Sequence, residues 1–272
     1  RLVTLQNPTQ KKSDDFGKAV AVSDKYVIVG APYDDTISNG AGIVYLYDNT
    51  GSFAKSKSLK LPQHGPFDYF GKAVSAESSH NNILVGATGH ANNGIISGSA
   101  FLFDGNTGDV TAEFANISPK SGEKFGQSVA FSKKYLLIGD PSAMINGTSI
   151  GAISLYDISS HQHLKDIYSL YPDVKDNFEN SISRVVGTDA FVVGSPDDDA
   201  KSAVSAGTAY LFYPQDIFSK NNPPIAFAGS DQTVPKNTIV TLNATGSIDV
   251  DGDVPSYHWS QNSGNNIISL VN

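Results

Sequence analysis

Cysteine is absent from all 272 residues, and charge of positive sign is scarce. Without cysteine, the chain has no disulfide scaffold, no thiolate metal site and no cysteine nucleophile. The formal net charge is -8, and no cluster of Lys and Arg of the kind that binds phosphate occurs. We therefore expect no nucleic-acid partner.

Long apolar runs are also missing. No stretch of about 18 consecutive apolar residues occurs, so we expect no direct membrane insertion. The chain starts at Arg1 with no signal-like segment before it, and we interpret it as a mature or excised fragment. Its 25 Gly and 13 Pro, with a hydrophobic content of 39%, are typical of a compact, turn-rich protein rather than a disordered one.

The sequence does contain one pattern that occurs four times, with a period of 53 to 55 residues. Each unit opens on a Phe, passes an apolar run to a triplet like Gly-Ala-Pro, and ends on a second apolar run. The opening residues are Phe16, Phe70, Phe125 and Phe178. A fixed period near 50 with several short apolar runs per unit is typical of a propeller or a similar array.

Each unit contains four β-like runs: one about eleven residues before the opening Phe, one after it, one leading into the triplet, and one at the end. Residues 2–5 are the first of these runs in the first unit, and residues 58–61 are the first in the second unit. Runs such as 20–22 and 27–29 are apolar on both faces, as expected for a sheet between two others. The sequence therefore predicts an all-β fold, a β-propeller of four-stranded antiparallel blades.

The repeats fill residues 1–213, and the Pro- and Asn-rich residues 214–224 predict a linker. Two arrangements stay open. In the first, residues 2–5 pair with the last apolar run, 210–212, and close a four-bladed ring. In the second, further blades precede the chain in the parent protein.

Residues 225–272 have a different pattern, with short alternating runs and a turn about every ten residues, which is typical of a β-sandwich. Such domains need roughly 80 to 100 residues, so this one is partial. We expect Trp259, the only Trp, to anchor its core.

The four units resemble FG-GAP repeats, the blades of the integrin α-subunit propeller and of many bacterial surface proteins. The resemblance rests on a register that recurs four times. Only the first unit has both Phe16-Gly17 and Gly30-Ala31-Pro32, and the fourth has Glu179 and Ser195 in place of the motif Gly and Ala. The tail resembles a PKD or REJ-type immunoglobulin-like domain over residues 228–234, 249–253 and 257–259. Together these resemblances imply an extracellular module for adhesion or recognition.

Clusters of carboxylates predict candidate Ca²⁺ sites, because a hard cation takes oxygen ligands. The candidates follow the first and fourth triplets and the second apolar run of the tail; they are Asp34, Asp35, Asp197, Asp199, Asp249, Asp251 and Asp253. The alternative for each is a solvated loop or a polar turn. The calcium loops of integrin-type blades do not transfer, because the connectors at residues 23–25 and 132–134 are too short to supply six to eight oxygens.

An acidic residue also stands two positions before each opening Phe: Asp14, Asp68, Glu123 and Asp176. These either form a circle of carboxylates in a ring of blades, or each caps a turn by accepting backbone N–H groups. We interpret them as caps, since isolated caps need no ligand.

The functional prediction is a non-enzymatic binding module, secreted or on the cell surface. Histidines lie in separate loops or two apart in a turn, and no Gly-x-Ser-x-Gly elbow or phosphate loop occurs. The longest loops, 32–42, 88–98, 141–151 and 196–207, are the expected contact surface for a protein or carbohydrate ligand, although they hold few aromatic anchors. The alternatives are an accessory region of a larger secreted enzyme and a structural surface or biofilm protein.

Overall fold

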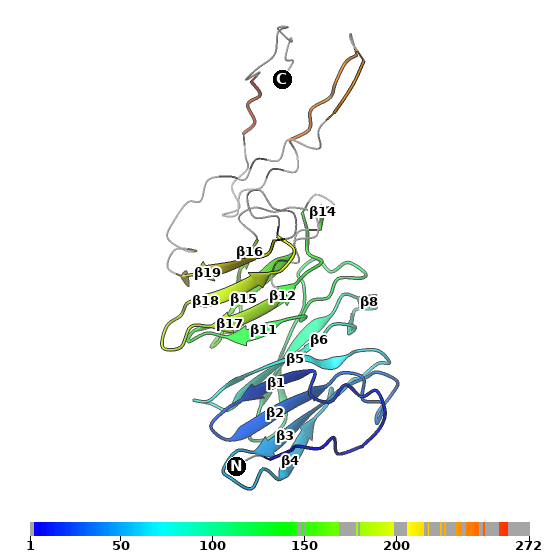
Figure 1. Cartoon of the computed structure of the whole chain (residues 1–272), viewed down its shortest axis with the longest axis vertical. Coiled ribbons are helices and arrows are strands. Elements are labelled where there is room, and N and C mark those ends of the chain that lie inside the picture. Colours follow the sequence, from blue (N-terminus) through cyan, green and yellow to red (C-terminus); the bar gives the residue numbers. More distant parts are fainter. Residues whose placement is uncertain are drawn as a thin grey trace.

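The computed structural model describes residues 3–145, 148–149, 151–168, 178, 180–198, 206–214, 217, 224, 226, 232–235, 238–244, 247 and 256–260. Every element with assigned bounds in this part of the chain is a β-strand (Figure 1), and among the described residues only 214 and 217 are helical. The all-β prediction is confirmed.

The strands form four antiparallel sheets, which follow one another along the chain. The first contains β1 (Ala19–Val22), β2 (Tyr26–Ala31), β3 (Ile43–Asp48) and β4 (Lys55–Leu59); the second β5 (Phe70–Glu77), β6 (Asn82–Ala87), β9 (Ser99–Asp104) and β10 (Val110–Phe114); the third β11 (Val129–Phe131), β12 (Tyr135–Asp140), β15 (Ala152–Asp157) and β16 (His163–Ile167); the fourth β17 (Ser181–Arg184), β18 (Phe191–Ser195) and β19 (Thr208–Phe212). The short hairpins β7 (Ala91–Asn92)–β8 (Ile95–Ile96) and β13 (Met144–Ile145)–β14 (Thr148–Ser149) project from the second and third. Four-stranded antiparallel sheets of this kind are the blades of a propeller.

The grouping of strands into blades differs from the prediction. The run before Phe70 forms β4, which pairs with β3 of the preceding unit in the register Val44 to Leu59. Strands β10 and β16 pair in the same way with β9 and β15. The reason is the short turn that follows β3, since a connection of a few residues favours an antiparallel hairpin with the strand just completed. The chain crosses to the next blade only afterwards.

Hydrophobic clusters fill the spaces between successive sheets. Phe70, Phe125 and Phe178 are completely buried, each in the cluster between its own sheet and the preceding one. The opening Phe of a unit therefore fills the interface between two blades. Phe16 has no preceding sheet and instead packs on the outer face of the first sheet, against Tyr45 and Tyr47.

The two glycines of the motif mark where neighbouring sheets touch through their backbones. A Cβ on Gly30 would collide with the carbonyl oxygen of Gly71, and a Cβ on Gly86 with that of Gly126. Gly71 and Gly126 also have φ of +92° and +88°, in the left-handed region that favours glycine. The distance between neighbouring sheets at this point is thus set by a close backbone contact, which any side chain would prevent.

The first and fourth sheets lie at opposite ends of the stack (Figure 1). Val20 and Val22 of β1 are 66% and 63% exposed, so the prediction of two buried faces is wrong there. It is confirmed for β11, where the equivalent Val129 and Phe131 are buried because β11 lies between two sheets. Position in the stack decides the burial of otherwise similar strands.

The predicted strand at residues 2–5 is wrong where the structure describes it. Residues 3–7 form no strand, and Leu5 packs against the outer face of the first sheet instead of pairing with β19. The number of blades in the parent protein stays open.

The described part of the tail contains no assigned strand, and Trp259 is only partly buried. Ile239 is 94% exposed. The sandwich at 225–272 and the domain boundaries stay predictions. In the predicted linker, Ile217 packs against the cluster between the third and fourth sheets.

Candidate functional site

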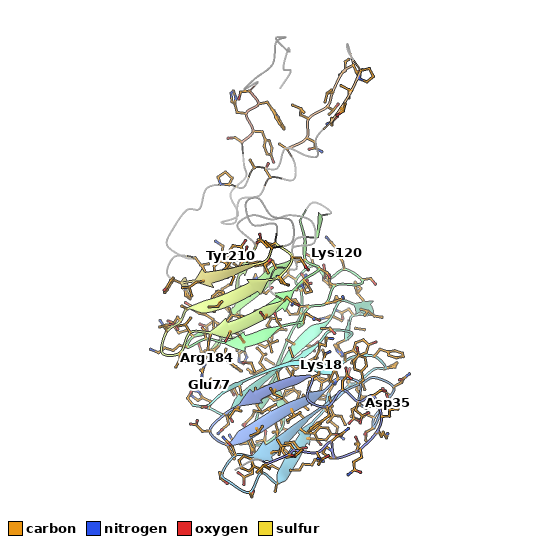
Figure 2. All side chains as sticks on the ribbon, viewed as in Figure 1. Lys18, Asp35, Glu77, Lys120, Arg184 and Tyr210 are labelled. Atoms are coloured by element: carbon orange, nitrogen blue, oxygen red, sulfur yellow. The ribbon has the colours of Figure 1, made fainter. Side chains whose placement is uncertain are left out.

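The blades present two different ends, which we call the turn end and the loop end. The turn end carries the hairpin turns around residues 48–54, 77–82 and 104–109. The loop end carries the longer loops that follow each triplet, such as 32–42 and 88–98. Glu77 and Asp35, labelled in Figure 2, lie on opposite sides of the stack.

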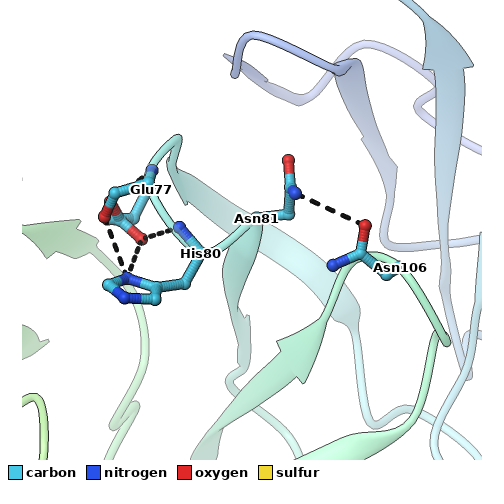
Figure 3. A network of polar contacts seen from close by, with 5 residues as sticks. Glu77, His80, Asn81 and Asn106 are labelled. Atoms are coloured by element: carbon cyan, nitrogen blue, oxygen red, sulfur yellow. Dashed lines mark hydrogen bonds and ion pairs between the residues drawn. The ribbon is translucent and has the colours of Figure 1, made fainter.

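Polar groups at the turn end are used to build the turns. Glu77 accepts the backbone N–H of His80 at 3.0 Å, and Asn81 donates to Asn106 Oδ1 at 3.3 Å across two turns of the second blade (Figure 3). Asp157 accepts from the hydroxyl and backbone N–H of Ser159, and these bonds lower the pKa of Asp157 to about 2. Hydrogen bonds of this kind are typical of Asx turns.

At the loop end, the first unit buries two carboxylates close together. Asp14 and Asp34 are 2% and 0% exposed, and the hydroxyl of Thr9 lies 2.7 Å from Asp14 Oδ2 and 3.4 Å from Asp34 Oδ2. Tyr45 donates its hydroxyl to Asp34 Oδ2 at 2.7 Å, and burial and then this carboxylate raise the pKa of Tyr45. Asn7 donates to Asp14 Oδ2 at 2.8 Å, while the buried Asp14 Oδ1 has no hydrogen-bond partner.

In the second unit an imidazole takes the place of the second carboxylate. His90 is equivalent to Asp34, and its Nδ1 lies 3.2 Å from Asp68 Oδ1, although off the direction of a hydrogen bond. Its Nε2 lies 3.7 Å from Glu113 Oε1. Burial disfavours the charged imidazole, but the two carboxylates outweigh burial and raise the pKa of His90. Asp68 also accepts the backbone N–H of Gly65 at 2.6 Å, which confirms it as a turn cap.

The third unit again buries two carboxylates. Glu123 accepts the backbone N–H of Lys120 at 2.8 Å, so it too is a turn cap. Asn116 Nδ2 donates to Glu123 Oε2 at 3.2 Å and to Asp140 Oδ2 at 3.3 Å. Burial, and then the Glu123 carboxylate, raise the pKa of Asp140 to about 6, against the lowering effect of the backbone N–H of Ser142.

The predicted calcium ligands fall into two groups. Asp34 is buried beside Asp14, and the exposed Asp35 accepts the backbone N–H of Gly40 at 2.8 Å. Asp197 is exposed, while its neighbour Asp198 is buried and accepts the hydroxyl of Tyr210, as Asp34 does with Tyr45. The other predicted ligands lie outside the described residues: Asp199, Asp249, Asp251 and Asp253. Asp176, the acidic residue before the fourth opening Phe, also lies outside them. Within the described ranges, no group of three or more His, Asp or Glu is placed to hold a metal ion, so calcium stays a prediction.

Three aromatic side chains gather at the loop end where the first and second blades meet. They are Tyr33, Phe67 and Tyr69, and we call them the aromatic platform. The rings of Tyr33 and Tyr69 are 5.1 Å apart and those of Phe67 and Tyr69 6.2 Å apart, centre to centre. Phe67 is 49% exposed and Tyr33 38% exposed.

Glycines from both blades form the floor of the platform. A Cβ on Gly40 would lie 3.1 Å from Phe67 Cδ1 and 3.4 Å from Tyr69 Cε1, and a Cβ on Gly89 would lie 3.0 Å from Tyr69 Cδ2. Only a residue without a side chain leaves room for the rings to lie this close to the loop backbone.

The backbone under the platform is strained. Phe67 and Tyr69 have φ of +65° and +54°, a region that is unfavourable for bulky residues. Hydrogen bonds to the loop of the first unit fix this backbone conformation: the N–H groups of Phe67 and Tyr69 donate to the carbonyls of Asn39 and Gly40 at 2.8 and 3.0 Å. The N–H of Gly89 donates to the carbonyl of Asp68 at 3.0 Å. Asp68 is buried, whereas its two neighbours carry the rings of the platform.

The fold does not require aromatic residues at these positions. The first unit has Ser13 and Asp15 there, with φ of +71° and +52°, and the third has Gly122 and Lys124. Strained backbone persists where its surroundings fix it, and it concentrates at functional sites. The aromatic pair is therefore a feature of the second unit alone among the three described units.

Sequence analysis missed the platform because its members come from two segments. Tyr33 follows the first triplet, whereas Phe67 and Tyr69 precede the second opening Phe by 3 residues and 1 residue. Comparing the residues on either side of the acidic position in each unit would have shown the exceptional pair.

Comparison with known families identifies repeats that begin before the opening Phe and end within β3 and β9, so that β4 and β10 lie outside them. The FG-GAP repeat family matches residues 9–47 and 60–103. Each of these two segments is similar to one FG-GAP repeat. They cover the first three strands of the first and second blades and both loops that support the platform. A search of curated proteins found no match. No helix in the described part of the chain is long and apolar enough to cross a membrane.

Proposed function

We propose that this protein is a non-enzymatic binding module, secreted or displayed on the cell surface, that recognises a protein or carbohydrate ligand through its loop end. FG-GAP repeats occur in integrin-like adhesion and binding modules, which supports this class of function. The observation that carries the proposal is the aromatic platform, because exposed aromatic side chains are the typical anchors of recognition surfaces.

The internal pairing of the buried carboxylates supports binding rather than catalysis. Asp34 is engaged by Tyr45, Asp68 by Gly65 and His90, and Glu123 by Asn116. These contacts stabilise the loops from below and leave the rings of the platform facing outwards. Binding residues are commonly carried in this way, on loops held by a rigid scaffold.

Calcium is the cofactor that we propose for the first unit. The residues fit a hard cation in one respect: Asp14 and Asp34 supply carboxylate oxygens, and Asp14 Oδ1 is buried without a hydrogen-bond partner. Asp14 and Asp34 would hold the ion, which would supply positive charge between two carboxylates whose described partners are neutral.

The test is a binding screen of the 272-residue chain against matrix proteins and oligosaccharides, with Ca²⁺ and with a chelator. The matched variant is Phe67→Gly with Tyr69→Lys, which places in the second unit the residues that the third unit already carries. We expect wild type to bind at least one member of the screen and the double variant to lose that binding. Absence of any ligand for wild type, or equal binding by the variant, would refute the proposal.

A further inference from the structure

We infer that the ligand of the aromatic platform is a neutral carbohydrate, held with the C–H face of a sugar ring against the exposed rings of Phe67 and Tyr33. This inference rests on the binding function proposed above and names the ligand class. The faces of aromatic rings carry partial negative charge, so they attract the weakly positive C–H groups that line one face of a pyranose.

The size of the platform favours a sugar over a protein. The platform is short, because its three ring centres are separated by only 5.1 Å and 6.2 Å. A stable protein interface buries about 800 Å² on each partner, with a core depleted of charged residues. Here Asp35 lies beside the rings, bound to the N–H of Gly40 on the floor of the platform.

The charge around the platform selects among sugars. Three carboxylates belong to the platform and its neighbours: the exposed Asp35 binds the floor at Gly40, the buried Asp68 stands between Phe67 and Tyr69 in the chain, and Glu113 lies 3.7 Å from His90. The imidazole of His90 lies between Asp68 and Glu113, so its charge is paired within this group. The whole chain carries a net charge of -8. Carboxylates accept hydrogen bonds from sugar hydroxyls but repel sulfate, sialate and uronate groups, so we expect neutral sugars to bind and anionic sugars to be rejected.

The rigidity of the platform matches a small ligand. The backbone N–H groups of Phe67, Tyr69 and Gly89 are all hydrogen-bonded to neighbouring loops. A sugar offers few contacts, and binding it is favourable only when little conformational freedom is lost. The strained but fixed backbone holds the rings in place before the ligand arrives.

The experiment uses an array of neutral oligosaccharides of glucose, mannose, galactose and N-acetylglucosamine beside sulfated, sialylated and uronate-containing ones. Wild type is compared with Phe67→Gly plus Tyr69→Lys, with Phe67→Ser plus Tyr69→Asp, and with Tyr213→Ser. The second double variant carries the residues of the first unit, and Tyr213, 43% exposed on the fourth blade, is the aromatic control. Circular dichroism and thermal unfolding verify that each variant folds.

We expect wild type and Tyr213→Ser to bind a neutral oligosaccharide, and both double variants to bind it at least tenfold more weakly. Preference for anionic sugars, or unchanged binding by the folded double variants, overturns the inference. If wild type binds no sugar but binds a matrix protein through the platform, the carbohydrate inference fails while the proposed binding function stands. If nothing binds in either screen, both fail.

Discussion

Replacing Asp140 by asparagine tests the buried pair of carboxylates in the third blade. Asp140 is 1% exposed and stands where the first two units have Ala31 and Ala87. The groups that face it are the carboxylate of Glu123, the amide of Asn116, the backbone N–H groups of Ser142 and Lys124, and the side chain of Tyr168. The pKa of Tyr168 is raised to about 12, first by burial and then by the carboxylates of Asp166 and Asp140. None of these described neighbours offers Asp140 a charged cationic group.

The expected effect follows from the pKa of Asp140, which is about 6 in the folded chain against 3.8 for an ordinary Asp. At a pH between these two pKa values, Asp140 keeps its proton in the folded state and has lost it in the unfolded state. The free energy of unfolding therefore falls as the pH rises from about 4 to about 6, and the loss is complete above pH 6. A difference of about two pKa units corresponds to about 3 kcal/mol.

The assay is urea-induced unfolding followed by circular dichroism at several pH values between 4 and 7.5. In Asp140→Asn, asparagine keeps the shape and an acceptor for the N–H of Ser142, and it carries no titrating proton. We expect the variant to be more stable than wild type at pH 7.5 by up to about 3 kcal/mol, and to lose this advantage towards pH 4. Asp24→Asn, at an exposed turn position, controls for the change in net charge.

The reasoning is refuted if Asp140→Asn shows the same pH dependence as wild type, or if its advantage grows towards low pH. The first result would mean that the carboxylate is ionised at an ordinary pH in the folded chain. The second would mean that hydrogen bonds to the ionised form outweigh burial.

Three further predictions concern the platform, the contact between blades and calcium. Phe67→Gly removes a half-exposed ring but relieves a left-handed backbone, so we expect urea unfolding to show a change in stability below about 1 kcal/mol; a loss of several kcal/mol would contradict the strain argument. Gly30→Ala places a Cβ against the carbonyl oxygen of Gly71, and we expect it to lower the free energy of unfolding by about 3 kcal/mol, whereas Gly65→Ala, which has only a side-chain neighbour in reach, lowers it by less. Ca²⁺ at a hundredfold excess over its dissociation constant adds about 2.7 kcal/mol to the free energy of unfolding. We therefore expect Ca²⁺ to raise the midpoint of thermal unfolding of the wild type and not of Asp34→Asn. An unchanged midpoint for the wild type would argue against the proposed ion.

The repeat made much of the fold predictable. The four opening Phe residues fixed the period, and the apolar runs around them located nearly every strand of the four sheets. The turn-cap interpretation is confirmed for Asp68 and Glu123, because an acidic residue can reach a backbone N–H three positions away whatever the rest of the fold does. Local chemistry of this kind is contained in the sequence.

Tertiary structure decided what depended on neighbours in space. Val20 and Val129 stand at equivalent positions in the repeat, yet one is exposed and the other buried, because only β11 has a sheet on both sides. Residues 2–5 have a β-like composition, but the described part of this segment covers the first sheet without pairing in it.

The candidate site divides in the same way. The sequence shows that loops with carboxylates follow the first and fourth triplets, since this is a matter of composition and spacing along the chain. It did not determine that Tyr33 and Tyr69, 36 residues apart, have rings 5.1 Å from each other. That contact exists because close approach of the glycine backbones stacks one blade on the next and brings the loops of two units to a shared surface.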